Sequence, residues 1–162
     1  MEKVTLPKFP VHGGCQCGKV RYALKAPPVT FYCCHCTECQ RQSSSAFGQS
    51  MRVRIEDIQV TGEMARFTRE KTASGSALLC DFCPDCGVRL FHRREAYEAD
   101  VSLKAGSLDD TSWLIPAGHI WTGSKQKWVA IPDGELAYSG QPEGFEALKK
   151  SWQEMTGLGA GQ

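Results

Sequence analysis

Hydrophobic and polar residues alternate in short runs through most of this chain, so apolar side chains recur at every second position. A period of two places these side chains on one face of an extended segment, which is typical of a half-buried β-strand. Glycines and prolines between the runs predict tight turns. The pattern therefore predicts a mainly β fold with short strands, which contain Val20, Tyr22 and Leu24; Val29 and Phe31; Val53 and Ile55; Ala77 and Leu79; Val88, Leu90 and His92; and Val101 and Leu103.

A different periodicity begins near residue 145. Apolar residues recur there at steps of three and four positions, at Phe145, Leu148, Trp152 and Met155. Charged residues occupy the positions between them. This spacing predicts one C-terminal amphipathic helix, whose apolar face packs against the rest of the protein.

The length of 162 residues suits one domain with a hydrophobic core and is short for two. We expect a single domain over residues 12–156. Residues 1–11 contain two prolines and little periodicity, which predicts an extended N-terminal leader. Residues 157–162 are rich in glycine and are expected to form a flexible tail.

The charge of the chain excludes several classes of partner. There are 19 basic and 18 acidic residues and no run of Lys or Arg, so we expect no nucleic acid partner. The first residues lack the apolar stretch of a secretory signal, and no segment approaches the roughly 18 consecutive apolar residues of a membrane span. We therefore expect a soluble, cytoplasmic protein with no membrane partner. The sequence leaves self-association into a homo-oligomer open.

Nine cysteines are the most informative part of the composition. In a reducing compartment, clustered cysteines usually mean metal binding or redox chemistry. A disulfide framework is the alternative, but an odd number of thiols would leave one unpaired. Seven of the nine cysteines lie in three clusters with metal-ligand spacing: Cys15-Gln16-Cys17, Cys34-His35-Cys36-Thr37-Glu38-Cys39 and Cys83-Pro84-Asp85-Cys86.

The third cluster has the form of a zinc knuckle. In such a knuckle a tight turn aims two sulfurs at the metal, and Gly87 directly after Cys86 allows the positive φ that the turn needs. Cys15 and Cys17 lie two positions apart, so in an extended segment both sulfurs point to the same side. Together the two pairs would supply the four ligands of a closed, structural zinc site.

Cys34, Cys36 and Cys39 would then form a second site with three ligands and one open position, as catalytic zinc usually has. His35 lies between two of these cysteines, and in an extended chain its ring points away from the metal that they share. We therefore expect His35 beside the site or at the surface, and not as a ligand. His119 is also expected to lie outside the coordination sphere.

A second pairing of the cysteines is open on spacing alone. Cys36 and Cys39 with Cys83 and Cys86 would make a two-knuckle zinc ribbon with a single structural zinc. Two further cysteines lie outside either scheme and are expected to behave as small buried hydrophobic residues, namely Cys33 and Cys80.

Three motifs follow one another in an order that is specific to one family. They run from Gly13 to Tyr22, from Cys34 to Arg41 and from Phe82 to Gly87. In this respect the chain resembles the glutathione-dependent formaldehyde-activating enzyme family, which includes the centromere protein V domain. Residues 106–110 and 116–128 also look like the family, so the resemblance extends from about His12 to Tyr138.

The resemblance implies a division of the clustered cysteines into four and three. It places a structural zinc on the first and third clusters and a second zinc, which binds the glutathione thiol, on the middle cluster. The implied fold is a set of several short, coiled antiparallel β-sheets organised around these zinc-binding clusters. The implied metal ligands are Cys15, Cys17, Cys83 and Cys86 for the first zinc, and Cys34, Cys36 and Cys39 for the second.

The implied activity joins formaldehyde to glutathione and gives S-(hydroxymethyl)glutathione, which is classed as a carbon–sulfur lyase reaction for the reverse direction. The three cysteines of the middle cluster would be the catalytic residues, with a small thiol such as glutathione and a small aldehyde as partners. A non-enzymatic, zinc-scaffolded binding module of the same fold is the competing function, because one fold hosts unrelated functions.

Residues that would contact the substrate are less clearly marked. Glutathione carries carboxylates, so Arg41 beside the middle motif is the preferred anchor, ahead of Arg52 and Arg54. Glu38 and Asp109 are candidate proton carriers. Three aromatic residues are suited to line a pocket or to pack in a core: Phe47, Trp121 and Trp128.

The chain departs from the family pattern at three positions. Ser44 stands where the family often has Gly, and Cys80 stands where an Arg is common. Val88 replaces a Thr or Ser after the knuckle. These departures leave the metal ligands intact, but they leave open which thiol and which aldehyde are the substrates.

Overall fold

The structure, a computed structural model, describes residues 2–72, 75–94 and 99–159. Within these residues it contains eleven β-strands, two α-helices and three short 3-10 helices. The predicted mainly β fold with a C-terminal helix is therefore confirmed. The chain divides into two compact units that alternate along the sequence: residues 1–6, 29–51 and 113–162 form the first, and residues 7–28 and 52–112 form the second. A single domain over residues 12–156 stays a prediction.

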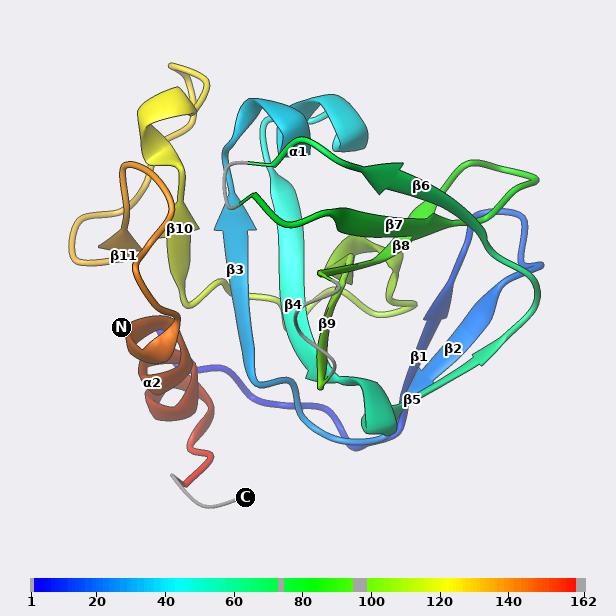
Figure 1. Cartoon of the computed structure of the whole chain (residues 1–162). Helices are drawn as coiled ribbons and strands as arrows, with labels where there is room; N and C mark the ends of the chain where they lie inside the picture. The colour runs from blue at the N-terminus through cyan, green and yellow to red at the C-terminus, as the bar shows by residue number, and fades with distance from the viewer. Residues whose placement is uncertain (1, 73–74, 95–98, 160–162) are drawn as a thin grey trace. The chain divides into compact units, whose positions relative to one another are not determined.

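The first unit is built on strand β3 (Thr30–Cys34), which Figure 1 shows as a long blue arrow. It lies in the strand order β11-β10-β3-β4, with β11 at Leu136–Ala137, β10 at Gly118–Ile120 and β4 at Gly48–Arg54. All five residues of β3 are buried, as is usual for a strand covered on both faces. Strand β10 runs parallel to both β3 and β11, which differs from the antiparallel pairing implied for the whole fold.

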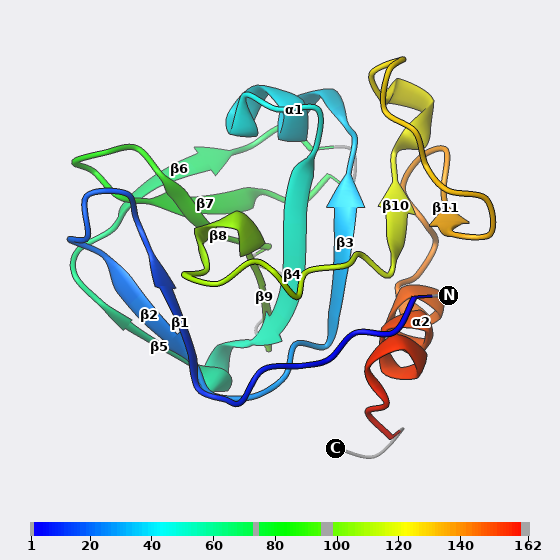
Figure 2. The ribbon, with the colours of Figure 1, turned by 180° about the vertical axis from the view of Figure 1, so that it is seen from behind.

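Helix α2 (Glu146–Thr156) is the predicted amphipathic helix of the first unit. Leu148 and Trp152 are fully buried, and the Trp152 ring packs with its centroid 6.3 Å from that of Phe31. The helix ends at Gly157, whose φ of 72° closes the last turn. Figures 1 and 2 show the N-terminal segment passing beside α2. There the backbone N–H of the buried Val4 donates to the carbonyl oxygen of Met155 over 2.9 Å.

The second unit contains two groups of antiparallel strands. The first group has the order β1-β2-β5, with β1 at Val11–Gly14, β2 at Arg21–Leu24 and β5 at Ile58–Thr61. The second has the order β9-β8-β7-β6, with β6 at Ala65–Arg69, β7 at Leu78–Phe82, β8 at Arg89–Arg94 and β9 at Asp100–Leu103. Their core contains the fully buried Leu24, Leu90 and Leu103.

Three local elements differ from the sequence prediction. Strand β1 begins at Val11, which is the last residue of the predicted leader. Ile55 lies in the 3-10 helix η1 (Ile55–Asp57) and not in a strand. Helix α1 (Thr37–Ser43) starts directly after Cys36 and was not predicted, because seven residues are too few to show a helical periodicity. The other 3-10 helices are η2 at Ala105–Ser107 and η3 at Thr122–Ser124.

Within the described residues, no helix combines the length and the apolar character that crossing a membrane requires.

Candidate metal centres and the adjoining pocket

Four cysteines of the second unit bring their sulfurs together. The Sγ atoms of Cys15, Cys17, Cys83 and Cys86 all lie within 4.8 Å of one another. The Sγ of Cys17 is 3.5 Å from that of Cys15 and 3.7 Å from that of Cys83. A tetrahedral zinc with bonds of about 2.3 Å to sulfur separates its ligands by about 3.8 Å. The observed spacing therefore fits a closed zinc site.

Two tight turns aim these sulfurs. Between β1 and β2 the chain folds back so that the N–H of Cys15 donates to the carbonyl of Val20, and the N–H of Val20 donates to the Cys15 sulfur over 3.2 Å. Between β7 and β8 the N–H of Gly87 donates to the carbonyl of Cys83 over 2.9 Å. Gly87 has a φ of 74°, as the knuckle motif predicted. Both turns thus leave their sulfurs pointing to one place.

Negative charge is unevenly shared among the thiols of this group. Burial raises the pKa of Cys15, but the N–H of Val20 and the thiols of Cys17, Cys83 and Cys86 donate to its sulfur and lower the pKa to about 6. A backbone N–H lowers the pKa of Cys17, but burial and the neighbouring thiols raise it to about 12. Four soft sulfur donors match the ligand preference of zinc, whose charge would offset that of their thiolates.

The second group of thiols lies where β3 meets α1 in the first unit. The Sγ atoms of Cys34, Cys36 and Cys39 lie within 4.8 Å of one another. Cys34 ends β3, Cys36 caps the N-terminus of α1, and the N–H of Cys39 donates to the Cys36 sulfur over 3.3 Å. Among the described residues, no further Cys, His, Asp or Glu ligand atom joins this group. It therefore offers three sulfurs to a metal ion and no fourth ligand of these types.

Charge is unevenly shared among these three thiols. Hydrogen bonds from the thiols of Cys34 and Cys39 lower the pKa of Cys36. Hydrogen bonds with Cys36 and Cys39 raise the pKa of the Cys34 thiol, and burial adds to this effect. Thiols this close cannot all ionise unless a cation offsets their repulsion. A soft divalent cation such as zinc would supply that charge, so this donor set also fits a metal ion.

His35 lies between two of these cysteines and is fully buried. Its Nε2 is 2.9 Å from Nδ1 of His119, whose Nε2 is 3.0 Å from Oε2 of Glu135. Because the carboxylate accepts, His119 donates from Nε2 and accepts at Nδ1 from the Nε2–H of His35. Burial lowers the pKa of His35 to about 4, and the charges of His119 and Lys125 add to this effect. Neither imidazole joins the thiol group.

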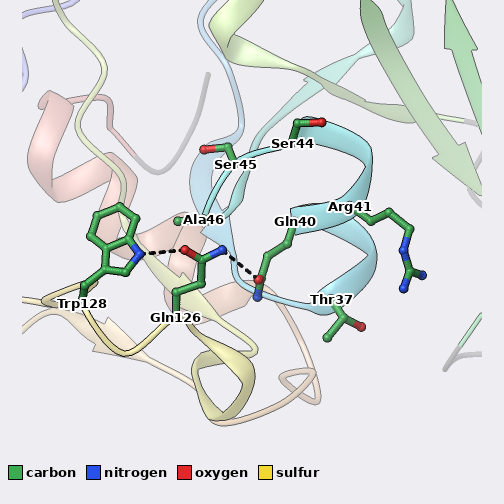
Figure 3. A pocket seen from close by; sticks show the side chains of 8 residues that line it. All are labelled: Thr37, Gln40, Arg41, Ser44, Ser45, Ala46, Gln126 and Trp128. Carbon is green, nitrogen blue, oxygen red and sulfur yellow. Dashed lines mark hydrogen bonds between the residues drawn. The ribbon is translucent and has the colours of Figure 1, made fainter.

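A pocket of about 640 Å³ lies along α1 (Figure 3). Cys36 and Cys39 each come one residue before a pocket residue, and no cysteine itself lines the pocket. The residues of α1 that face it recur at helical spacing and are joined by residues of the loop after η3. The main lining side chains are Thr37, Gln40, Arg41, Ser44, Gln126 and Trp128.

Arg41 is the one predicted anchor that lines this pocket. Its side chain is 75% exposed, and its Nη1 donates to Oε1 of Glu38 over 2.7 Å. Arg52 is 3.5 Å from Asp100, and Arg54 is 3.8 Å from Glu56. Neither Arg52 nor Arg54 lines the pocket.

The other predicted contacts lie in different surroundings. Asp109, a candidate proton carrier, receives hydrogen bonds from Arg21 on both carboxylate oxygens. The ring of Phe47 packs with its centroid 5.2 Å from that of His35. Trp121 has a positive φ of 59°, and its Nε1 donates to Gln141. Trp128 alone of the three aromatics lines the pocket, and it is 75% exposed.

Two polar residues at the site lie in stretches that resemble the family, but sequence reasoning gave them no role. Gln40 Nε2 donates to the carbonyl oxygens of His35 over 2.7 Å and of Ser124 over 2.9 Å. Ser124 Oγ also donates to the His35 carbonyl, over 3.0 Å. These bonds hold the segment between Cys34 and Cys36 from segments distant in sequence, so no local pattern reveals them. Cys33 and Cys80 are buried, as predicted, and lie outside both sulfur groups.

The fold and the two sulfur groups define a class of protein: a mainly β chain with cysteine clusters able to hold metal ions. The family model described as glutathione-dependent formaldehyde-activating enzyme matches residues 10–124, which is well over half of the chain. The chain therefore belongs to the glutathione-dependent formaldehyde-activating enzyme family.

The chain is also similar to a solved structure, the crystal structure of a Rhodobacter sphaeroides protein from structural genomics. The two share 17% sequence identity with a TM-score of 0.47, and the match covers 78% of this chain and 98% of that chain. No curated protein matches this chain.

Proposed function

We propose that this protein is a zinc-dependent carbon–sulfur lyase-type enzyme that condenses a small thiol, glutathione or a similar one, with formaldehyde or a related small aldehyde. The observation that carries the proposal is the group of Cys34, Cys36 and Cys39, which offers three sulfurs to a metal and leaves a position for a thiol. Family membership supports the same substrates. We propose a structural zinc on Cys15, Cys17, Cys83 and Cys86.

The half-buried positions of Cys36 and Cys39 support access of a small molecule to the second group, whereas Cys34 is buried. A zinc ion held there would favour the thiolate form of a bound thiol, which is the nucleophile. The chain's own residues would orient the reactants: the β3–α1 junction holds the three sulfurs, and the bonds from Gln40 and Ser124 hold the backbone between them. Fixing a thiol beside an aldehyde raises its effective concentration.

The proposed reaction balances without a further reactant. The thiol gives up its proton, its sulfur forms a bond to the aldehyde carbon, and the π pair of the C=O bond moves to oxygen. The oxygen then takes up one proton, so the product is a hydroxymethyl thioether. In the reverse direction the carbon–sulfur bond breaks, which is the lyase reaction.

The test is the rate at which the protein interconverts glutathione and formaldehyde with S-(hydroxymethyl)glutathione, measured by exchange NMR on ¹³C-formaldehyde with zinc content recorded for each sample. We expect acceleration by the wild type, and only the uncatalysed rate with Cys36→Ser. Cys33→Ala is the matched control, because this buried thiol on β3 lies outside the sulfur group, and it should keep the activity. If the protein holds two zinc ions but accelerates the reaction of formaldehyde with neither glutathione nor other small thiols, it is a binding module and not this enzyme.

A further inference from the structure

A second pocket, of about 530 Å³, lies in the first unit and contains no residue of either thiol group. Its walls are residues 115–117 before β10, residues 132–136 at the start of β11 and one face of α2, with Glu2 from the N-terminal segment. It has no lining residue in common with the pocket along α1. Pockets of this volume commonly hold small molecules, and the proposed function leaves this one unassigned.

The floor of this second pocket is apolar. Met155 and Ala117 are buried there, and Ile115 and Leu136 are half-buried. The hydroxyl of the buried Ser151 is already satisfied, because its Oγ donates to the carbonyl oxygen of Ala117 over 3.2 Å. The floor can therefore take up the hydrocarbon part of a ligand, and burying that part away from water favours binding.

The charged groups around this floor are mostly acidic. Four carboxylates and one ammonium line the pocket, although the whole chain carries a net charge of +1. The ammonium, Lys150, lies 3.9 Å from Glu154. Among the described residues, neither Asp133 nor Glu2 has an ion pair or a hydrogen bond through its side chain. A cleft with apolar walls and charges of one sign concentrates ions of the opposite sign, so this pocket favours a cation.

Glu135 supplies a carboxylate whose position is fixed. Its side chain is 33% exposed, and its Oε2 accepts a hydrogen bond from Nε2 of His119 over 3.0 Å. A carboxylate has about four acceptor sites on its two oxygens, so this bond leaves room for a further donor. The pocket therefore combines one held carboxylate at Glu135 with exposed carboxylates at Asp133 and Glu2.

The carboxylates of the pocket do not form a metal site. Calcium and magnesium need several oxygen ligands around one point. Among the described residues, only the two thiol groups bring three or more ligand side chains within 4.8 Å of one another. The apolar floor also suits a hydrocarbon better than a hydrated ion. An organic cation meets both demands, because its ammonium can reach the carboxylates while its hydrocarbon covers the floor.

We propose that the pocket between α2 and the residues before β10 and β11 binds a small amine with a hydrocarbon body. The hydrocarbon packs on the floor beside Ile115 and Met155, and the ammonium donates to the carboxylates of Asp133 and Glu135. Lys150 carries the same charge as the ligand and opposes its binding. This second ligand site goes beyond the proposed function and does not depend on it.

The first experiment titrates the zinc-loaded full chain with n-hexylamine at pH 7, where an alkyl amine is charged as lysine is, and follows the backbone amides by NMR. We expect saturable shifts in residues 115–117 and 132–136 and in α2. The alcohol 1-hexanol has the same hydrocarbon without the charge and should bind several-fold more weakly. Added salt should weaken binding of the amine more than binding of the alcohol. Shifts that do not saturate, shifts centred elsewhere, or equal affinities for amine and alcohol overturn the proposal.

The second experiment removes a carboxylate. Asp133→Asn should weaken binding of hexylamine about two- to fivefold, as loss of an exposed ion pair does. Glu63→Gln is the matched control, because this exposed carboxylate does not line the pocket, and it should leave the affinity unchanged. Equal affinities of the two variants overturn the role of Asp133.

The third experiment removes the competing cation, and the expected effect has the opposite sign. Lys150→Gln should strengthen binding of hexylamine, because the carboxylates then have only the ligand as a cation. Lys149→Gln should leave the affinity unchanged, because Lys149 is on the same helix but does not line the pocket and pairs with Glu146. A gain with both variants, or a loss with Lys150→Gln, overturns the proposal. None of these measurements depends on whether the protein accelerates a reaction of thiols, so this site and the proposed function are tested separately.

Discussion

Replacing Cys83 by serine tests whether the four-sulfur group holds the second unit together. The Cys83 sulfur is fully buried and lies 3.7 Å from that of Cys17, which is 66 positions away in the chain. A metal that joins them closes a loop of that length. The length-dependent part of the entropic free-energy cost of closing it, (3/2)RT ln n, is about 3.7 kcal/mol. The three-sulfur group spans only five positions, from Cys34 to Cys39, for which the same expression is about 1.4 kcal/mol.

These values translate into different melting temperatures. In a protein of this size, 1 kcal/mol shifts the melting temperature by roughly 2–4 °C. Cys83→Ser should therefore lower it by at least about 7–15 °C, and more where the remaining buried thiolates lose their counter-charge. Cys36→Ser should lower it by about 3–6 °C and remove one zinc with little change in the circular dichroism spectrum. The measurements are calorimetry and zinc content on the same zinc-loaded samples.

Equal lowering of the melting temperature by the two substitutions would refute this reasoning. A second measurement keeps the test decisive if Cys83→Ser abolishes folding. In a chelator titration of the wild type, the first zinc should leave without a change in secondary structure, and unfolding should accompany only the second. Unfolding with the first zinc contradicts the division between the two groups.

Three further predictions concern the fold. Burial and the charges of Lys104, Arg89 and Arg69 hold the pKa of His92 well below its usual value. Below about pH 6.5 the unfolded chain therefore binds a proton that the folded chain does not. The free energy of unfolding should fall by up to about 1.4 kcal/mol for each unit by which the pH is lowered. Denaturant titrations from pH 7 to pH 5 should show a shallower fall for His92→Gln. Trp152→Ala should cost about 3–5 kcal/mol in the same assay at pH 7, because this fully buried ring fills the contact between α2 and β3. Gly87→Ala should lower the free energy of unfolding by about 1–2 kcal/mol and speed zinc loss, because Gly87 has a positive φ. Gly87→Asn should lower it less, because asparagine adopts a positive φ more readily. Equal effects of the two substitutions would contradict this explanation.

Features that depend on nearby residues could be predicted from the sequence. The period of two identified segments of β2, β3, β4, β7, β8 and β9, and the helical spacing identified α2. The knuckle turn at Gly87 followed from five consecutive residues. The β3–α1 junction was predicted only in part, because the extended chain ends at Cys36 and a helix of seven residues, mostly polar, shows no periodicity.

Features of the site that join distant segments could not be predicted in this way. His35 was expected beside the site or at the surface; it lies outside the thiol group, as expected, and is buried, and its pairing with His119, 84 positions away, was not predicted. The contact from Gln126 to Gln40 spans 86 positions. Both glutamines lie in stretches that resemble the family, but neither stretch shows that they meet; only the packing of the loop after η3 against α1 brings their amides together.

By itself, the sequence determined segments of six strands, the C-terminal helix and the three clusters of thiols at metal-ligand spacing, because backbone periodicity and turn geometry act over a few residues. Spacing alone left the pairing of the thiol clusters open. The tertiary structure decided that Cys15 and Cys17 meet Cys83 and Cys86, and that Arg41 and Trp128 line one pocket along α1. Which side chains converge across 66 or more positions depends on strand pairing and packing of the whole chain, and no local pattern contains that information.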